Sequence, residues 1–354
     1  MTKPSTKKIN YQFGIDSFGD LATKENGELT TYAEAIRLVI DEAVLADKLG
    51  IDVIALGEHH RDDFAISSPE MVLSAIASKT KNIKLASGVT VLSSDDPVRV
   101  FERFSTLDAA SNGRAQVILG RGSFTESFPL FGYDLRDYNE LFEEKVELFS
   151  ELLKETPVTW EGKMRPSLHE ADVFPKTESG KLDTMIGVGG SPESVIRAAA
   201  YGLPLMLAII GGSPDRFRPY AELYRRAAEE AGTPVHPIGM HSPGYIADTD
   251  EEAIETAFPL IKEQMDRVGA SRGWTPMTRE HFMSEVAYGS LYVGSPETVA
   301  KKIARAMRSV GAERFDLVYG FGPVKVEARR KMIELYATKV IPRVRELLAE
   351  RAED

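Results

Sequence analysis

The chain has 354 residues, 43% of them hydrophobic, so it is long enough to bury a large core, and its net charge of −11 leaves no basic surface for nucleic acid. It has no cysteine, which excludes disulfides, thiolate nucleophiles and cysteine-based metal sites and fits a cytosolic protein. The N-terminal segment MTKPSTKKINYQFG lacks the apolar stretch of a signal peptide, and we expect the first eight residues to form a disordered lead-in. The longest apolar runs, such as 203–210, are far shorter than the ~20 residues of a membrane span, so no membrane association is expected.

Short apolar runs alternate with helical patterns along the chain. At 32–49, for example, Ile36, Val39, Ile40 and Ala43 recur every three or four residues, and Gly50 follows as a C-cap. A Ser-Pro-acid sequence, typical of a helix N-terminus, opens the helices at 68, 191, 213 and 295. In chain order we predict strands within 11–18, 51–60, 83–92, 115–120, 185–190, 203–210, 237–247 and 315–319, and helices at 32–49, 68–79, 96–110, 138–154, 191–201, 213–231, 295–310 and over the C-terminus.

These elements form eight strand–helix units. The strands are continuous apolar runs, as expected for strands buried on both faces, and alternation of strands with helices predicts a parallel sheet with right-handed crossovers. Eight units favour closure into a (β/α)8 TIM barrel over an open doubly wound sheet, which remains the alternative. No linker divides the chain, so we predict one barrel domain over 1–354, with loop insertions at about 156–183 and 250–290.

Polar residues follow the second predicted strand, in the sequence Gly57-Glu58-His59-His60-Arg61-Asp62. In a barrel, the loops after the carboxyl ends of the strands build the active site. Successive strand residues point to opposite faces, so His59 and His60 should not bind one metal ion, and only one of them should face the barrel mouth. Imidazole titrates near neutral pH and can transfer protons, but one packed and one solvated histidine is an equally open interpretation here.

Glycine-rich turns follow three further strands. Gly187-Val188-Gly189-Gly190-Ser191 runs into a helix N-terminus, where free backbone N–H groups and the helix dipole favour an anion such as phosphate. The alternative is that Ser191 is only an N-cap. Gly120-Arg121-Gly122-Ser123 and Gly211-Gly212 could likewise let backbone approach a ligand. None of these turns is a Rossmann or P-loop fingerprint.

Taken in order, three motifs resemble the bacterial luciferase-like monooxygenases: GEHH at 57–60, GVTVLSSDDPVRVFERFSTLDAASNGRAQVILGRGS at 88–123, and GGSPESVIRAAAYGLPLML at 189–207. The resemblance extends from about residue 11 to 344 and implies FMN at the barrel mouth, a non-proline cis peptide at Gly88-Val89, and His59 as the catalytic histidine. The candidate catalytic residues are therefore Glu58, His59 and Arg121. The candidate cofactor-binding residues, taken from the glycine turns and the resemblance together, are Gly88, Val89, Thr90, Arg121, Ser123, Gly189, Gly190, Ser191, Ser194, Gly211 and Gly212.

The sequence also departs from the family. Gly120 stands where some luciferases have a reactive cysteine, and Gly190 where they have an acid, so light emission is not expected. A sister branch that uses a deazaflavin typically shows Asp-His at the second strand, so the Glu-His-His here favours FMN.

The resemblance implies a monooxygenase that takes reduced FMN from a separate flavin reductase and oxygenates a small organic substrate. Two alternatives stay open: hydride transfer with NAD(P)H or deazaflavin, and a non-catalytic flavin-binding protein. Family members commonly dimerise through early helices, and we expect a homodimer through 68–79 and 96–110. The apolar residues proposed for that face are Met71, Val72, Ala75, Ile76, Phe101 and Phe104.

Overall fold

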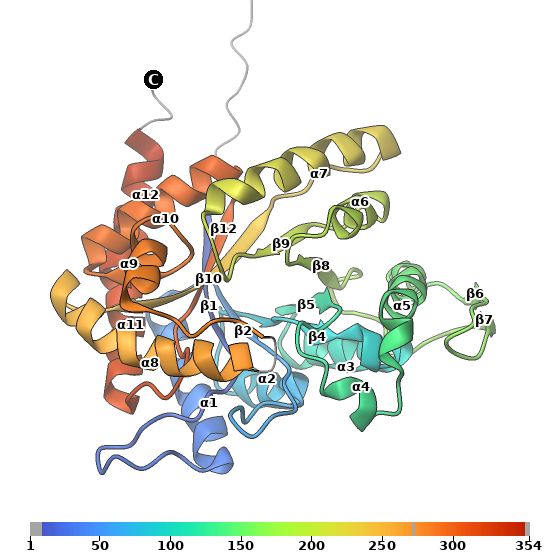
Figure 1. The fold of residues 1–354 in the computed structure, drawn as a ribbon. Helices are drawn as coiled ribbons and strands as arrows, with labels where there is room; N and C mark the ends of the chain where they lie inside the picture. Colours follow the sequence, from blue (N-terminus) through green and yellow to red (C-terminus); the bar gives the residue numbers. More distant parts are fainter. Residues whose placement is uncertain (1–8, 271–272, 351–354) are drawn as a thin grey trace, which may run out of the picture.

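Eight parallel strands close into a barrel surrounded by helices, which confirms the predicted (β/α)8 fold (Figure 1). The computed structural model describes residues 9–270 and 273–350, so the lead-in expected over the first eight residues lies outside the described part. Closure occurs at β1, where Ile15 lies opposite Ile54 of β2 and Leu317 of β12. The barrel strands are β1 (Gln12–Ser17), β2 (Val53–Leu56), β3 (Lys84–Ser87), β5 (Ala115–Gly120), β8 (Asp183–Val188), β9 (Leu205–Ala208), β10 (Gly239–Ile246) and β12 (Arg314–Val318).

Capping residues fix where several outer helices begin and end. Thr31 and Glu34 form a reciprocal capping box at the start of α1, and Asp96 accepts two backbone N–H groups at the start of α3. Gly232 and Gly311 end α7 and α10 in the left-handed conformation that glycine adopts without strain. The helices are α1 (Tyr32–Lys48), α2 (Pro69–Ala77), α3 (Pro97–Ala110), α5 (Tyr138–Leu152), α6 (Pro192–Ala200), α7 (Arg218–Ala231), α10 (Pro296–Val310), α11 (Val326–Leu335) and α12 (Ile341–Glu350), with a π-helical turn at Tyr336–Val340.

Several short elements lie in the loops. The 156–183 segment holds the antiparallel hairpin of β6 (Val158–Trp160) and β7 (Leu168–Ala171), which projects at the right-hand edge of Figure 1. The 250–290 segment holds the helices α8 (Asp250–Ala270) and α9 (Arg279–Ala287). The remaining elements are β4 (Thr90–Val91), β11 (Tyr292–Gly294), α4 (Ser127–Leu130) and 3-10 turns at Leu92–Ser94, Leu135–Asp137 and Pro214–Phe217.

Two predicted strands are shorter than the sequence suggested. The second strand ends at Leu56, four residues before His60, because Gly57 begins an irregular turn. The third splits into β3 and β4 around the Gly88-Val89 peptide, which is cis as the resemblance implied. Both differences lie at carboxyl ends of strands, where the barrel builds its site.

The helix faces proposed for a dimer are largely used inside the chain. Val72 and Ile76 of α2 and Phe101 and Phe104 of α3 are all buried in the core, so the expectation that they form an exposed apolar face is wrong. Their pattern is explained by packing against the barrel, while Met71 is exposed. A homodimer stays a prediction. None of the helices in the described residues is long and apolar enough to cross a membrane.

A buried polar layer ties the strands together inside the barrel. The Arg314 guanidinium of β12 donates to its strand neighbour Asp316 at 2.9 Å and reaches across the interior to the side-chain oxygen of Gln116 on β5. The Gln116 amide donates in turn to Asp183 of β8 at 2.9 Å, and Lys84 of β3 also donates to Asp183, at 3.0 Å. Four strands are therefore linked through one chain of hydrogen bonds.

Replacing Arg314 with methionine should destabilise the fold strongly. The Asp316 side chain is fully buried, and removing its cation leaves an uncompensated charge, which costs about 3–5 kcal/mol. Chemical denaturation measures the free energy of unfolding. The control is Arg218→Met, which removes a helix-surface pair with Glu222 whose arginine side chain is 66% exposed and should cost less than about 1 kcal/mol. Equal losses in both variants would contradict this role for Arg314.

Candidate active site

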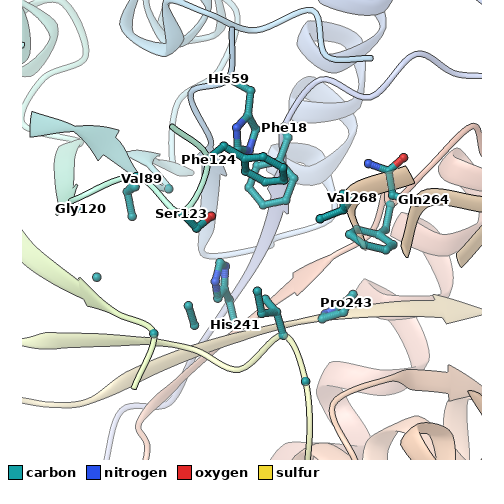
Figure 2. Close-up of a pocket in the computed structure, with 18 of the residues that line it drawn as sticks. Phe18, His59, Val89, Gly120, Ser123, Phe124, His241, Pro243, Gln264 and Val268 are labelled. Atoms are coloured by element: carbon teal, nitrogen blue, oxygen red, sulfur yellow. The ribbon is translucent and has the colours of Figure 1, made fainter. Parts of the chain in front are cut away.

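A cavity of about 630 Å³ opens at the carboxyl ends of the barrel strands. This volume lies within the ~300–1,000 Å³ range of ligand pockets. Its walls come from the loops after β1, β2, β3, β5, β8, β9 and β10, and from α8 and α9 of the 250–290 segment. Figure 2 shows His59 and Phe124 on one side of it and His241 on the opposite side. The site is therefore where barrel enzymes carry out their chemistry.

The turn after β2 is held by Gly57 and Glu58. A side chain on Gly57 would lie 2.2 Å from the Phe18 ring, so only glycine fits there. The Glu58 carboxylate accepts the backbone N–H of Val91 at 2.9 Å and lies 2.9 Å from Nε2 of His60. Glu58 thus joins the β2 turn to β4 and orients His60.

His59 lies in an aromatic enclosure. Its ring centre is 4.5 Å from that of Phe64, 4.8 Å from Phe124 and 5.0 Å from Phe18, and its Nδ1 lies 3.6 Å from the Glu126 carboxylate. Burial raises the pKa of Glu126, but the His59 ring and backbone hydrogen bonds outweigh it and hold this pKa below its ordinary value. Glu126 is thus a carboxylate that can orient His59 and balance its charge.

His59 and His60 both line the cavity, so the prediction that they lie on opposite sides is wrong. Strand alternation does not apply to them because the strand ends at Leu56. The two rings differ instead in their partners. His60 contacts Glu58 and the edge of Phe131, whereas His59 contacts Glu126.

Val89 projects into the cavity wall through space left by two glycines. A Cβ on Gly120 of β5 would lie 2.5 Å from Val89, and one on Gly187 of β8 would lie 2.8 Å from it. Gly88, Val89 and Gly120 all line the cavity. Thr90 does not, because its hydroxyl donates to Ser87 at 2.9 Å in the buried interior.

A second histidine–carboxylate pair lies across the cavity from His59. Nδ1 of His241 on β10 is 2.7 Å from the Asp16 carboxylate on β1, and His241 lines the cavity (Figure 2). The other Asp16 oxygen has no hydrogen-bond partner among the described residues, and burial raises the pKa of Asp16. His241 was not among the candidate residues expected from the sequence. The only sequence signal was its place in a predicted strand, because its partner is 225 residues away.

The residues of the β5 and β8 turns proposed to bind the cofactor divide into two groups. Arg121, Ser123 and Gly189 line the cavity, and Arg121 donates to Asn139 at 3.0 Å. Gly190, Ser191 and Ser194 are not part of the lining. The Ser191 hydroxyl accepts the backbone N–H of Ser194 at 3.4 Å as an N-cap and donates to Glu193 at 2.7 Å.

The Gly211-Gly212 turn lines the cavity but is not a free anion site. The Gly212 N–H donates to the Glu285 carboxylate of α9 at 3.0 Å, so a carboxylate of the chain itself occupies this turn. No cluster of three or more metal-ligating side chains occurs within residues 9–270 and 273–350.

The barrel and its cavity define the class as a (β/α)8 enzyme scaffold, and comparison with known proteins identifies the family. The profile of the luciferase-like monooxygenases matches residues 17–314. The chain therefore belongs to the luciferase-like monooxygenase family, as its motifs implied.

Two relatives illustrate the range of the family. The alkanal monooxygenase alpha chain of Photorhabdus luminescens is 25% identical over 67% of this chain, and the chain spans only 65% of that relative's length. The 3,6-diketocamphane 1,6-monooxygenase of Pseudomonas putida is 25% identical over 86% of this chain and 92% of its own length.

Solved structures support the fold. Monooxygenase RslO1 from Streptomyces bottropensis has a TM-score of 0.81 at 24% identity, covering 94% of this chain and 99% of that one. A type II Baeyer-Villiger monooxygenase from Pseudomonas putida, solved in complex with FMN, has a TM-score of 0.76 at 20% identity, covering 94% and 98%. The coenzyme F420 dependent tetrahydromethanopterin reductase from Methanopyrus kandleri has a TM-score of 0.68 at 20% identity, covering 94% and 99%.

The close approach of Val89 to Gly120 predicts that a side chain at position 120 destabilises the fold. Gly120→Ala should lower the free energy of unfolding by about 1–3 kcal/mol, because the new methyl group overlaps Val89. Gly189→Ala is the matched control, since this cavity glycine has no atom within 4 Å of the added Cβ. Thermal and chemical denaturation of both variants make the comparison. A Gly120→Ala protein as stable as the Gly189→Ala protein would rule out the proposed contact.

Proposed function

We propose that this protein is an FMN-dependent monooxygenase that takes reduced FMN from a separate flavin reductase and uses dioxygen to oxygenate a small organic substrate. The observation that carries the proposal is the charge distribution of the cavity. Among its described lining residues Arg121 is the only lysine or arginine, and it shares the lining with the Gly189 turn at the start of α6. A flat ring system whose ribityl chain ends in one phosphate matches a largely apolar cavity with one fixed cation.

The residues that line the cavity could hold both the phosphate and the ring of FMN. Arg121, the Gly189 amide and the N-terminus of α6 would hold the phosphate, and Ser191 and Ser194 would join them if Ser191 released Glu193. Gly88 and Val89 would lie against the ring, as the resemblance implies, since both line the cavity and Val89 faces it from the side opposite Gln264 and Val268 of α8 (Figure 2). Bound in its reduced form, FMN supplies the electrons that let one oxygen atom of dioxygen enter the substrate and the other leave as water.

His59 is the residue best placed to move a proton. It lines the cavity, its side chain is only 11% exposed, and Glu126 beside it can stabilise a positive charge on the ring. The His241–Asp16 pair faces the same space from β10 and could hold a second polar group. Water is restricted around His59 by Phe18, Phe64 and Phe124.

Hydride transfer with a deazaflavin is the second candidate. It is favoured by the structural likeness to the coenzyme F420 dependent reductase, whereas Glu58-His59-His60 differs from the Asp-His that this branch typically shows. A flavin-binding protein without turnover is the third. Consumption of dioxygen with substrate separates the first candidate from both.

Arg121→Leu should raise the dissociation constant of FMN by about 10- to 150-fold, because a charge-assisted hydrogen bond is worth about 1.5–3 kcal/mol. Quenching of flavin fluorescence measures binding. Riboflavin, which lacks the phosphate, should bind both proteins equally. Arg136→Leu, at an arginine whose side chain is 89% exposed, is the control and should leave FMN affinity unchanged. Unaltered FMN affinity in Arg121→Leu would remove Arg121 from the phosphate site.

His59→Ala should lower turnover by about 10²–10⁴-fold, the usual contribution of a general acid or base, while FMN affinity stays the same. Turnover is measured with a flavin reductase over a panel of aldehydes and ketones. His60→Ala should mainly lower the thermal midpoint, because His60 is tied to Glu58. The reverse outcome, an unstable His59→Ala protein with normal turnover per folded molecule, would show that His59 is structural.

A further inference from the structure

The Asp16–His241 pair lies beside the residues proposed to contact the FMN ring. The Asp16 carboxylate packs against Gly88, because a Cβ added to Gly88 would lie 3.2 Å from Oδ2 and 3.4 Å from Oδ1. The same Oδ2 lies 2.7 Å from Nδ1 of His241. A single carboxyl group therefore connects Gly88, which would lie against the ring, with an imidazole that lines the same cavity.

The imidazole of His241 is held in one orientation. The backbone carbonyl of His241 accepts the N–H of Ile209 at 3.0 Å, and Asp16 holds the Nδ1 edge of the ring. The side chain is only 10% exposed. Figure 2 shows the ring pointing from β10 into the cavity, toward the side that carries His59. Because Nδ1 is turned to Asp16, Nε2 on the opposite edge is the nitrogen that a ligand in the cavity can meet.

Burial favours a pair without net charge. The Asp16 side chain is 1% exposed, and its Oδ1 has no hydrogen-bond partner among residues 9–270 and 273–350. The nearby Arg314 is already bound to Asp316, whose carboxylate oxygens accept its Nε–H at 2.9 and 3.1 Å. Burial raises the pKa of the Asp16 carboxyl, although the hydrogen bond with His241 opposes this rise. A buried net charge is costly, so the pair keeps the proton that neutralises it.

A neutral pair presents an N–H donor to the cavity. The bridging proton can belong to Asp16, which then donates to Nδ1 of a neutral imidazole, or to His241 as an imidazolium beside a carboxylate. In the first arrangement the imidazole proton is on Nε2, and in the second both ring nitrogens are protonated. Nε2 of His241 is a donor in either case.

Reduced FMN suits such a donor better than oxidised FMN does. The reduced ring readily loses a proton and then carries negative charge around N1 and the C2 carbonyl oxygen, whereas the oxidised ring is neutral. A hydrogen bond to an ionised acceptor is roughly twice as strong as one to a neutral acceptor. A donor beside these ring atoms therefore stabilises the reduced form more than the oxidised form.

We propose that His241, held by Asp16, donates a hydrogen bond from Nε2 to the FMN ring at the atoms that carry the negative charge of the reduced form. The inference rests on the proposed function for the identity of the cofactor and for the place of its ring. In this account His241 is a binding residue that raises the reduction potential of the bound flavin.

Two equilibrium measurements made without dioxygen test this role and need no turnover. Titration gives the dissociation constants of oxidised and reduced FMN, and equilibration with a reference dye gives the reduction potential of the bound flavin. His241→Leu should lower the preference for reduced over oxidised FMN by about 3- to 10-fold, because the lost hydrogen bond is stronger with the ionised ring. The potential should fall by about 15–30 mV, since a tenfold change equals about 30 mV for a two-electron couple.

Three further variants separate the hydrogen bond from packing. His241→Gln keeps an N–H donor near the place of Nε2, so its potential should lie closer to that of the unaltered protein. The double variant Asp16→Asn, His241→Leu leaves no unpaired buried charge and should match His241→Leu in potential, whatever its stability. His236→Leu changes a histidine that precedes β10 and is not part of the cavity lining, and it should alter neither affinity.

An unchanged preference in His241→Leu, or equal losses for the two forms of FMN, would overturn the hydrogen bond, because a purely structural role affects both forms alike. A His241→Gln protein with a potential as low as that of His241→Leu would contradict it as well. If the unaltered protein bound FMN in neither state, the cofactor assignment itself would be refuted. Binding with an unchanged preference would instead refute only the role of His241.

Discussion

The barrel depends on a hydrogen-bonded cation at its centre. Arg314 neutralises Asp316 and reaches Gln116 across the interior, so that strands far apart in the sequence are held at fixed distances. Buried charges are tolerated only when paired, so loss of either partner would leave an uncompensated charge inside the closed ring. Above this layer, towards the carboxyl ends, the Asp16–His241 pair follows the same rule but opens onto the cavity. The barrel interior thus contains a buried ion pair, Arg314 with Asp316, and, nearer the carboxyl ends of the strands, the Asp16–His241 pair, which faces the ligand cavity.

Glycines at the strand ends turn this scaffold into a site. Gly120 and Gly187 make room for Val89, and Gly57 makes room for Phe18. These close approaches shape the wall against which a flat ring could lie. On the other side of the cavity, α8 contributes Gln264, Met265 and Val268, and α9 contributes His281 and Glu285. The two walls of the cavity therefore come from different parts of the chain. His59 and Arg121 lie in the loops that follow β2 and β5, whereas Gln264 belongs to the 250–290 segment.

Much of the fold could be predicted because its signals are local. Continuous apolar runs, Ser-Pro-acid helix starts and their order gave eight units, and the family motifs led to the cis peptide at Gly88-Val89. The predictions that failed depended on where a strand ends and on contacts between distant residues, which a local sequence pattern does not contain. The assignment of His59 and His60 to opposite sides assumed a strand that in fact ends at Leu56. His241 was missed because Asp16 lies on another strand. The contact of Glu285 with the Gly212 N–H could not be foreseen either, because the two residues are 73 positions apart.

The central claim is that the cavity holds reduced FMN and passes oxygen from dioxygen to a substrate. The most direct measurement supplies the protein with FMN, a flavin reductase and 2-nonanone under dioxygen labelled with the heavy oxygen isotope, and determines the mass of the product. The account predicts a product that carries one labelled oxygen atom and that requires both FMN and dioxygen. Turnover that proceeds without dioxygen, driven by a reduced deazaflavin or NADPH and yielding a product without added oxygen, would contradict it.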